Sequence, residues 1–447
     1  MDISQWVDAM LAERRRKADL LDQQRARLKD LQADLRNRQV MLHAIQLSPD
    51  RSRTDSVQTA FPQEALIHEE MTQLREQMLQ IDMLTNRYDT IIDRFRRDHI
   101  NIVMWNDPKP YTGIYAAPEA ADLRERFPEL SDACYFFRSS VSAFYWKNTV
   151  IFRNDPLIGK GKIRAEIRFR TQEEIAACAA KLIRMLDPDS EAAKMLTFDG
   201  IGLIDLAMYE QRTKTKDGDE SAYGADCMTA FHDLSSMVNG FSAFHHLAGR
   251  PALISDDPEE ITQYLKRYDR EGRAGGPEYY LWWAVSGVEI SCRFRADFGK
   301  IRLIDSPTTV DTTSISIADM AAAPEERDAD AAVIVRLPFM GDLENRDIDL
   351  FVHLKQKYQD SGMEQRLFYL VVGDGREALG YRDALIQRLK VPADHVLLTA
   401  WENKEAVVYD FMVPMLERLL DNIESCDNAY IQELADEASR LQKTLQG

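Results

Sequence analysis

The sequence predicts an α/β protein: a mostly parallel sheet with helices on both faces, joined to a helical hairpin. From residue 99 onward, short apolar runs of strand composition alternate with stretches of helical periodicity. Before residue 99 the chain has leucines at heptad spacing and no strand pattern. The expected strands are 99–104, 163–169, 288–294, 301–304, 331–335, 367–372 and 395–399.

The hairpin is expected from two long polar helices, 6–46 and 63–97, joined by the polar linker 48–62. Each arm has only about five heptads, and several seam positions hold Arg or Gln, which favours an antiparallel hairpin over an extended dimeric rod. A solvated helical appendage is the alternative. The leucines that repeat every seven residues in the first arm are Leu21, Leu28, Leu35 and Leu42.

The remaining chain divides into a head, 99–425, and a last helix, 426–447, that we expect to pack beside the hairpin 1–98. Helical patterns between the last four strands indicate parallel pairing, because parallel strands need crossover connections. The runs 288–294 and 301–304 are expected to form an antiparallel hairpin. A mainly helical insertion is expected over 171–280.

Composition narrows the function. The net charge is −18 and the pI about 5.0, which argues against nucleic acid as a partner. No apolar run approaches the roughly 18 residues of a membrane span, and the N-terminus lacks a signal-peptide pattern. Five scattered cysteines indicate free thiols in a reducing cytosol. A cytoplasmic protein is therefore expected.

One stretch carries a family resemblance. Residues 301–312 read Ile-Arg-Leu-Ile-Asp-Ser-Pro-Thr-Thr-Val-Asp-Thr. This resembles the strand ending in Asp-Thr-Pro-Gly-Leu-Gly-Asp-Thr of bacterial dynamin-like GTPases. Residues 330–338 and 94–104 are similar to two further strands of that family. The resemblance covers about 60–425 and implies a P-loop-GTPase-like head.

The phosphate-binding loop of that family is absent from its expected place. A working loop, GxxxxGK[ST], wraps phosphates with backbone N–H groups and neutralises them with its Lys. Residues 105–112 read Trp-Asn-Asp-Pro-Lys-Pro-Tyr-Thr, so Trp105 and Pro110 replace the glycines and Tyr111 replaces the Lys. Thr112 alone persists. Because prolines lack amide donors, we expect no phosphate cradle.

The other nucleotide motifs fail as well. By the resemblance, Tyr135 replaces the magnesium-binding threonine, and Thr308 replaces the glycine that senses the γ-phosphate. Gly373-Asp374 stands where the guanine-reading Asn-Lys belongs, and is expected to form a tight turn before a helix. Asp305 persists, as a turn-capping relic. The sequence therefore predicts a pseudo-GTPase with no catalytic residue, bound cofactor or metal.

Other candidate chemistry has simpler interpretations. His245-His246, near His232 and Cys227, suggests a metal site, but adjacent helical histidines diverge by about 100°. A core helix is the preferred interpretation, and Trp282-Trp283 are expected in the core. Residues 14–17, Arg-Arg-Arg-Lys, are interpreted as a solvated helix face rather than a lipid contact.

The expected function is an interaction protein. The resemblance implies that the head pairs across its old pocket, either with an active dynamin-like GTPase paralogue or with itself, using Trp105, Tyr111 and Tyr135 as aromatic anchors. It also links such systems to membrane maintenance, stress or phage defence, with membrane contact only through a partner. One alternative is GTP binding or slow hydrolysis through Lys109, Thr112 and Asp305. The other is a scaffold without a nucleotide-related partner.

Overall fold

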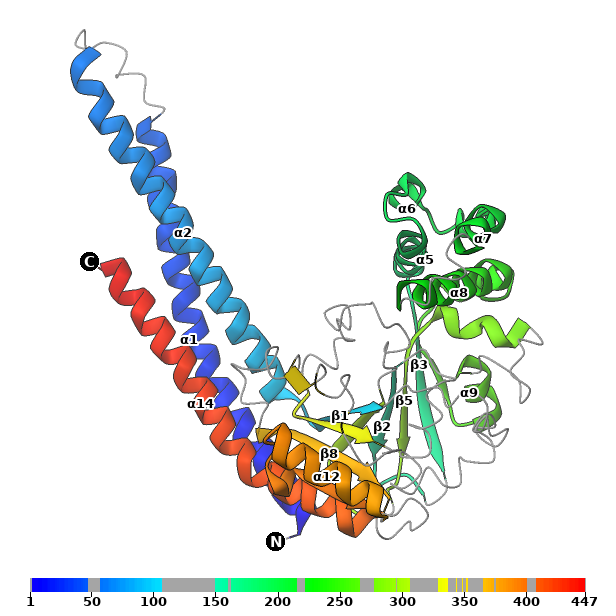
Figure 1. Ribbon diagram of the computed structural model, residues 1–447. Helices are drawn as coiled ribbons and strands as arrows, with labels where there is room; N and C mark the ends of the chain where they lie inside the picture. The colour runs from blue at the N-terminus through cyan, green and yellow to red at the C-terminus, as the bar shows by residue number, and fades with distance from the viewer. Residues whose placement is uncertain are drawn as a thin grey trace. The chain divides into compact units, whose positions relative to one another are not determined.

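The protein has two compact units, which are described separately (Figure 1). One comprises Asp8–Asp98 and Asn422–Gly447 and is helical; the other comprises Met1–Val7 and His99–Asp421 and contains the sheet. The computed structural model describes residues 2–46, 57–106, 149–159, 162–214, 222–265, 277–294, 296–305, 329–336, 343, 348, 351–352, 365–373, 375–399 and 407–446.

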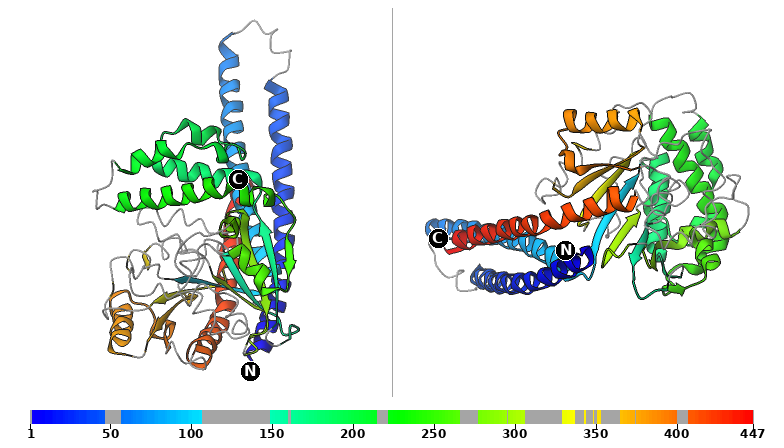
Figure 2. Two further views of the ribbon diagram at one scale, coloured as in Figure 1. Left: turned by 90° about the vertical axis from the view of Figure 1, so that its right-hand side faces the viewer. Right: turned by 90° about the horizontal axis from the view of Figure 1, so that it is seen from below.

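Three long helices build the helical unit: most of α1 (Ile3–Gln46), α2 (Val57–Arg96) and the second part of α14 (Val413–Gln446). They run side by side in both views of Figure 2. The heptad leucines of α1 face the other two helices, so the last helix packs on the hairpin. The shared core includes Leu21, Leu28 and Leu35 of α1, Leu74, Ile81 and Tyr88 of α2, and Leu434 and Leu441 of α14.

A buried ion pair joins α1 to α14. Arg14 is 1% exposed, and its Nε and Nη2 donate to the two carboxylate oxygens of Asp427 at 2.7 and 3.0 Å. Its guanidinium also lies 5.3 Å from the ring centroid of Phe95 on α2. A buried charge is tolerated when it is paired and hydrogen-bonded in this way. The interpretation of Arg14 as part of a solvated face is therefore wrong.

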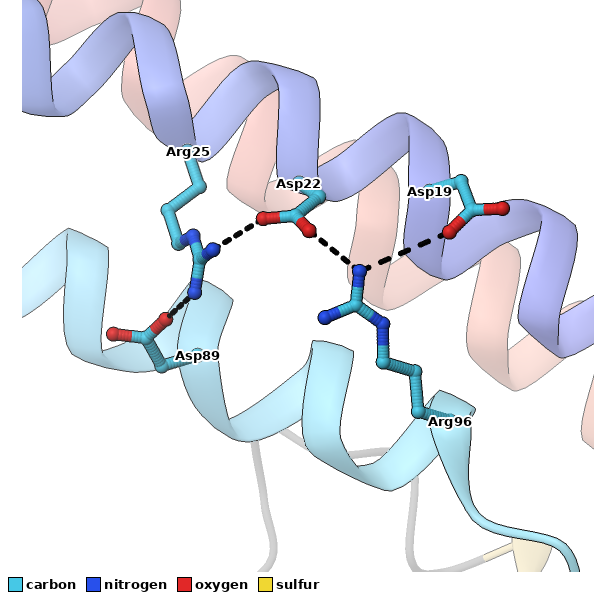
Figure 3. A network of polar contacts seen from close by, with 5 residues as sticks. All are labelled: Asp19, Asp22, Arg25, Asp89 and Arg96. Atoms are coloured by element: carbon cyan, nitrogen blue, oxygen red, sulfur yellow. Dashed lines mark hydrogen bonds and ion pairs between the residues drawn. The ribbon is translucent and has the colours of Figure 1, made fainter.

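A second polar network joins α1 to α2 (Figure 3). Arg25 contacts Asp22 on its own helix and Asp89 on α2, while Arg96 of α2 contacts Asp22 and lies 3.8 Å from Asp19. The hydrogen bond from Arg96, together with the charges of both arginines, lowers the pKa of Asp22 despite some desolvation. These contacts explain how a hairpin with arginines near its seam keeps one register.

The second unit is built on one mixed sheet of nine strands, in the order β4-β3-β5-β2-β6-β1-β7-β8-β9. The neighbours β5–β2, β6–β1, β1–β7, β7–β8 and β8–β9 are parallel, and the others antiparallel. The prediction of an α/β fold is confirmed. The strands are β1 (Ile100–Asn106), β2 (Thr149–Asn154), β3 (Ile163–Phe169), β4 (Leu253–Ser255), β5 (Val285–Cys292), β6 (Ile301–Asp305), β7 (Ala331–Arg336), β8 (Leu367–Val372) and β9 (Val396–Thr399).

The expected hairpin between 288–294 and 301–304 is wrong, because β2 lies between β5 and β6. Buried Asn154, the last residue of β2, holds the connection between those strands. Its Nδ2 donates to the carbonyl of Gly299 at 2.8 Å, and its Oδ1 accepts from the amide of Phe294 at 3.0 Å. The connection therefore passes over the end of β2 instead of closing a tight turn.

Helix α12 (Arg376–Arg388) covers part of one sheet face through Ala378, Tyr381 and Leu385. The chain between β3 and β5 is mainly helical and is called the helical segment; its helices lie together in Figure 1. These are α5 (Gln172–Leu186), α6 (Glu191–Met195), α7 (Leu206–Lys214), α8 (Ala222–Phe244) and α9 (Pro258–Leu265), with the 3-10 segments η4 (Ile201–Leu203), η5 (His245–Leu247) and η6 (Pro277–Ala284). Outside this segment, the 3-10 turn η11 (Ala393–His395) precedes β9, and a π-helical turn, η12 (Val407–Met412), precedes α14.

Trp282 and Trp283 are buried in the core of the helical segment, as predicted, and stack with ring centroids 4.0 Å apart. Arg170 anchors them, because its Nη1 donates to the carbonyl of Trp283 at 2.8 Å. Gly240 on α8 allows the nearby Tyr280 to pack closely, since a Cβ there would lie 2.3 Å from the ring of Tyr280.

Candidate functional site

The candidate site is the edge of the sheet where the parallel strands β6, β1, β7, β8 and β9 end. Strand β1 lies between β6 and β7, and the later strands β8 and β9 continue on the β7 side. The strand order thus reverses at β1. In open α/β sheets, ligands bind outside the carboxyl ends of the strands at such a switch point.

Two of the predicted site positions meet at this edge. Trp105 is the penultimate residue of β1, and Asp305 is the last residue of β6. In the β1–β6 ladder Asp305 pairs with Met104, the residue before Trp105. The backbone positions of Trp105, where the expected phosphate loop begins, and of Asp305 are therefore close together.

The remaining positions of the degenerate motifs lie outside the described residues. These are Pro110, Tyr111, Thr112, Tyr135, Thr308 and Asp374. Two of the three candidate interface aromatics, Tyr111 and Tyr135, are among them. For Trp105 the structure describes the strand backbone, which pairs with Ile334 of β7.

A glycine turn lies at the same edge, where the guanine-reading motif was expected. Gly373 follows β8 with φ +131°, a conformation that favours glycine, and its amide donates to the carbonyl of Thr399 at 2.8 Å. Gly375 is the N-cap of α12 and so provides no side-chain cap. The predicted helix after this segment is confirmed, whereas Asp374, the middle residue of the predicted turn, lies outside the described residues.

Sequence reasoning missed two polar residues at this edge. Arg336 ends β7 and Thr399 ends β9, and both are buried, at 4% and 3% exposure. The hydroxyl of Thr399 has no hydrogen-bond partner within the described part of the chain. The sequence signal that could have identified Arg336 is its place directly after the apolar run 331–335. A cation at the end of a buried strand needs a compensating partner, which marks it as a residue with a specific role. This edge therefore holds one buried cation and no described phosphate cradle.

One titratable group packs below this edge, against β8. His395 is buried, stacks on Phe368 at 4.7 Å between ring centroids, and its Nδ1 lies 2.9 Å from the carbonyl of Leu367. Desolvation lowers its pKa, against a smaller opposing effect of that hydrogen bond. The neutral ring donating through Nδ1–H is therefore favoured, which is a structural role rather than an acid–base role.

The histidine cluster considered as a metal site has its two adjacent rings at a right angle. The ring centroids of His245 and His246 are 5.8 Å apart and the interplanar angle is 81°. Within the described ranges no group of three or more His, Cys, Asp or Glu side chains is placed to hold a metal ion.

Comparison with known proteins assigns no relative: no family model matches the chain, and no curated protein matches its sequence. Among the helices that the structure describes, none is both long enough and apolar enough to cross a bilayer.

Proposed function

We propose that this chain is a degenerate member of the dynamin-like GTPases that does not turn over nucleotide and acts as a regulatory or structural partner. Its partner would be an active dynamin-like GTPase or a second copy of itself. The support is that the switch point of the sheet falls on the strand whose continuation should be a phosphate loop. The sequence there has Trp105, Pro110 and Tyr111 in place of the phosphate ligands.

The single observation behind the proposal is the convergence at one edge. The ends of β1, β6 and β8 lead into three of the four stretches at which the sequence departs from the nucleotide motifs, and the fourth, at Tyr135, lies outside the described residues. Parallel pairing through β7 puts these ends at the same side of the sheet. Failed motifs scattered over the fold would carry no such argument.

The partner role is tested by the GTPase rate of an active dynamin-like protein from the same genome, with and without this chain. We expect the rate to change severalfold in a saturable way, and Trp105→Ala to reduce the effect, because an aromatic anchor in a desolvated contact is worth about 2 kcal/mol or more. A surface variant far in sequence, Arg184→Gln, is the control. An unchanged rate, with the chain also monomeric by sedimentation, would refute the role.

One observation favours a second candidate, a slow GTPase with a rebuilt site. Asp305 lies at the switch point, beside the end of β1, where a magnesium-binding carboxylate would be useful. This candidate predicts phosphate release from GTP that falls to background in Asp305→Ala. A rate that is unchanged in that variant contradicts it.

A further inference from the structure

A row of cationic and polar side chains crosses the sheet away from the candidate edge. Strand register aligns one residue from each of five neighbouring strands, in the order β3, β5, β2, β6 and β1. Residues that pair in register have their side chains on the same face. The row, called the arginine row below, is Arg164, Ser291, Arg153, Arg302 and Asn101.

The arginine row contains an unfavourable pair. Arg153 and Arg302 are directly opposite each other on the antiparallel strands β2 and β6. Like charges in this position destabilise a sheet. A second like pair, Glu166 and Glu289 on β3 and β5, lies two residues along the strands.

One carboxylate serves both arginines of the unfavourable pair. Nη2 of Arg302 donates to both oxygens of Glu289, at 2.9 and 3.0 Å, while Nη1 of Arg153 lies 3.6 Å from the same carboxylate. Nε of Arg153 and Nε of Arg302 are themselves buried and have no hydrogen-bond partner among the described residues. Two guanidinium groups that share one carboxylate leave one positive charge without a partner carboxylate among these contacts.

The three arginines of the row remain partly accessible, whereas Asn101 at its β1 end is buried. The side chains of Arg153 and Arg302 are 34% and 25% exposed, and Arg164 at the β3 end is exposed. Three strand spacings separate Arg164 from Arg302, roughly 14 Å. An extended peptide with acidic residues at i, i+2 and i+4 spans about 13 Å, so it matches the row in length.

We propose that the arginine row binds a short, extended acidic peptide segment of a protein partner, with carboxylates on Arg164, Arg153 and Arg302. Arginine favours this ligand, because its planar fork binds carboxylates in a bidentate manner. The row is one residue wide and is bordered by the Glu166–Glu289 pair. These features disfavour a broad polyanion such as nucleic acid.

The test uses the full chain and a fluorescent peptide of about eight alternating Glu and Ser residues, followed by anisotropy at roughly 50 mM salt. We expect saturable binding that weakens about tenfold in Arg153→Gln and less in Arg164→Gln, since each loses a charge-assisted hydrogen bond. The exposed Arg184→Gln on α5 is the matched control and should bind like the parent.

The variant Glu289→Gln provides a second test, in which peptide binding is expected to become tighter rather than weaker. Removing the competing carboxylate frees both guanidinium groups, so we expect the peptide to bind about threefold more tightly or better. No saturable binding, or equal binding by Arg153→Gln and parent, overturns the proposal. Displacement of the peptide by an equal concentration of inorganic phosphate would show a one-ion site instead. Tighter binding of a single-stranded oligonucleotide would assign the row to nucleic acid.

Discussion

The two ends of the sheet differ in which side chains they bury. In β7, within the parallel end, every residue from Ala331 to Arg336 is buried, so both faces are covered. In β3, within the mixed end, buried and exposed residues alternate over Ile163–Ile167. This difference indicates which surfaces of the sheet can contact a ligand or a partner. Parallel strands offer only their edge, where the candidate site lies, while the mixed end also offers a face.

The mixed end is nevertheless sealed on its other face. Cys292 of β5 alternates with Ser291 of the arginine row and is fully buried. Burial raises the pKa of its thiol to about 12, since the thiolate would be desolvated. One face of this end thus supports folding, and the opposite face is left to charges.

The largest expected effect on stability comes from introducing an aspartate at a strand position in each end of the sheet. Val333→Asp places a carboxylate in the fully buried β7, and we expect a loss of more than about 4 kcal/mol of folding free energy. Ile254→Asp on β4, where the side chain is 49% exposed, should cost less than about 1 kcal/mol. Urea unfolding followed by circular dichroism measures both. Equal midpoints for the two variants would break the comparison.

A smaller effect is expected over the parallel end, where α12 covers it. Leu385→Ala removes a fully buried side chain that packs on the sheet, and should cost about 2–5 kcal/mol. Leu379→Ala on the same helix removes a side chain that is 41% exposed, and should change stability by about 0.5 kcal/mol at most. Chemical unfolding of the two variants measures both losses of stability. A small loss in Leu385→Ala would show that α12 is loosely attached.

His395 gives the parallel end a dependence on pH. Its folded-state pKa is depressed by desolvation, so its stabilising effect is complete above the unfolded pKa of about 6.5 and is lost as pH falls toward the folded value. Urea midpoints at neutral and acidic pH should therefore fall more for the parent than for His395→Asn. An equal fall in both would show that His395 does not contribute.

The smallest effect sharpens the account of the mixed end. Glu166→Gln removes one member of the like-charge pair with Glu289, so we expect a gain of about 0.2–0.5 kcal/mol rather than a loss. Raising the salt concentration should reduce the gain, because the repulsion is screened. A clear loss of stability would mean that Glu166 has a favourable contact in the fold.

The sequence predicted elements whose pattern is local. The heptad leucines of α1 and the apolar runs of β7 and β8 were identified because burial follows directly from their periodicity. The change of direction after β8 was also a local prediction, because glycine is the residue that adopts the conformation found at Gly373.

Features that depend on distant partners were not predictable. Arg14 looked solvated because its partner, Asp427, is 413 residues away. Strand β2 was missed because it ends in the polar residues Arg153 and Asn154, and the hydrogen-bond partners of Asn154 come from the β5–β6 connection. The arginine row joins residues of five strands, so only the register of the sheet reveals it.

The lost nucleotide site is the central claim, and calorimetric titration of the full chain with GTP and Mg²⁺ tests it most directly. Because residues 105–112 lack the glycines and the Lys of a phosphate-binding loop, we predict no saturable heat at nucleotide concentrations up to about 1 mM, the level at which binding is worth only about 4 kcal/mol. Saturable binding in the micromolar range, worth about 8 kcal/mol, would contradict the account.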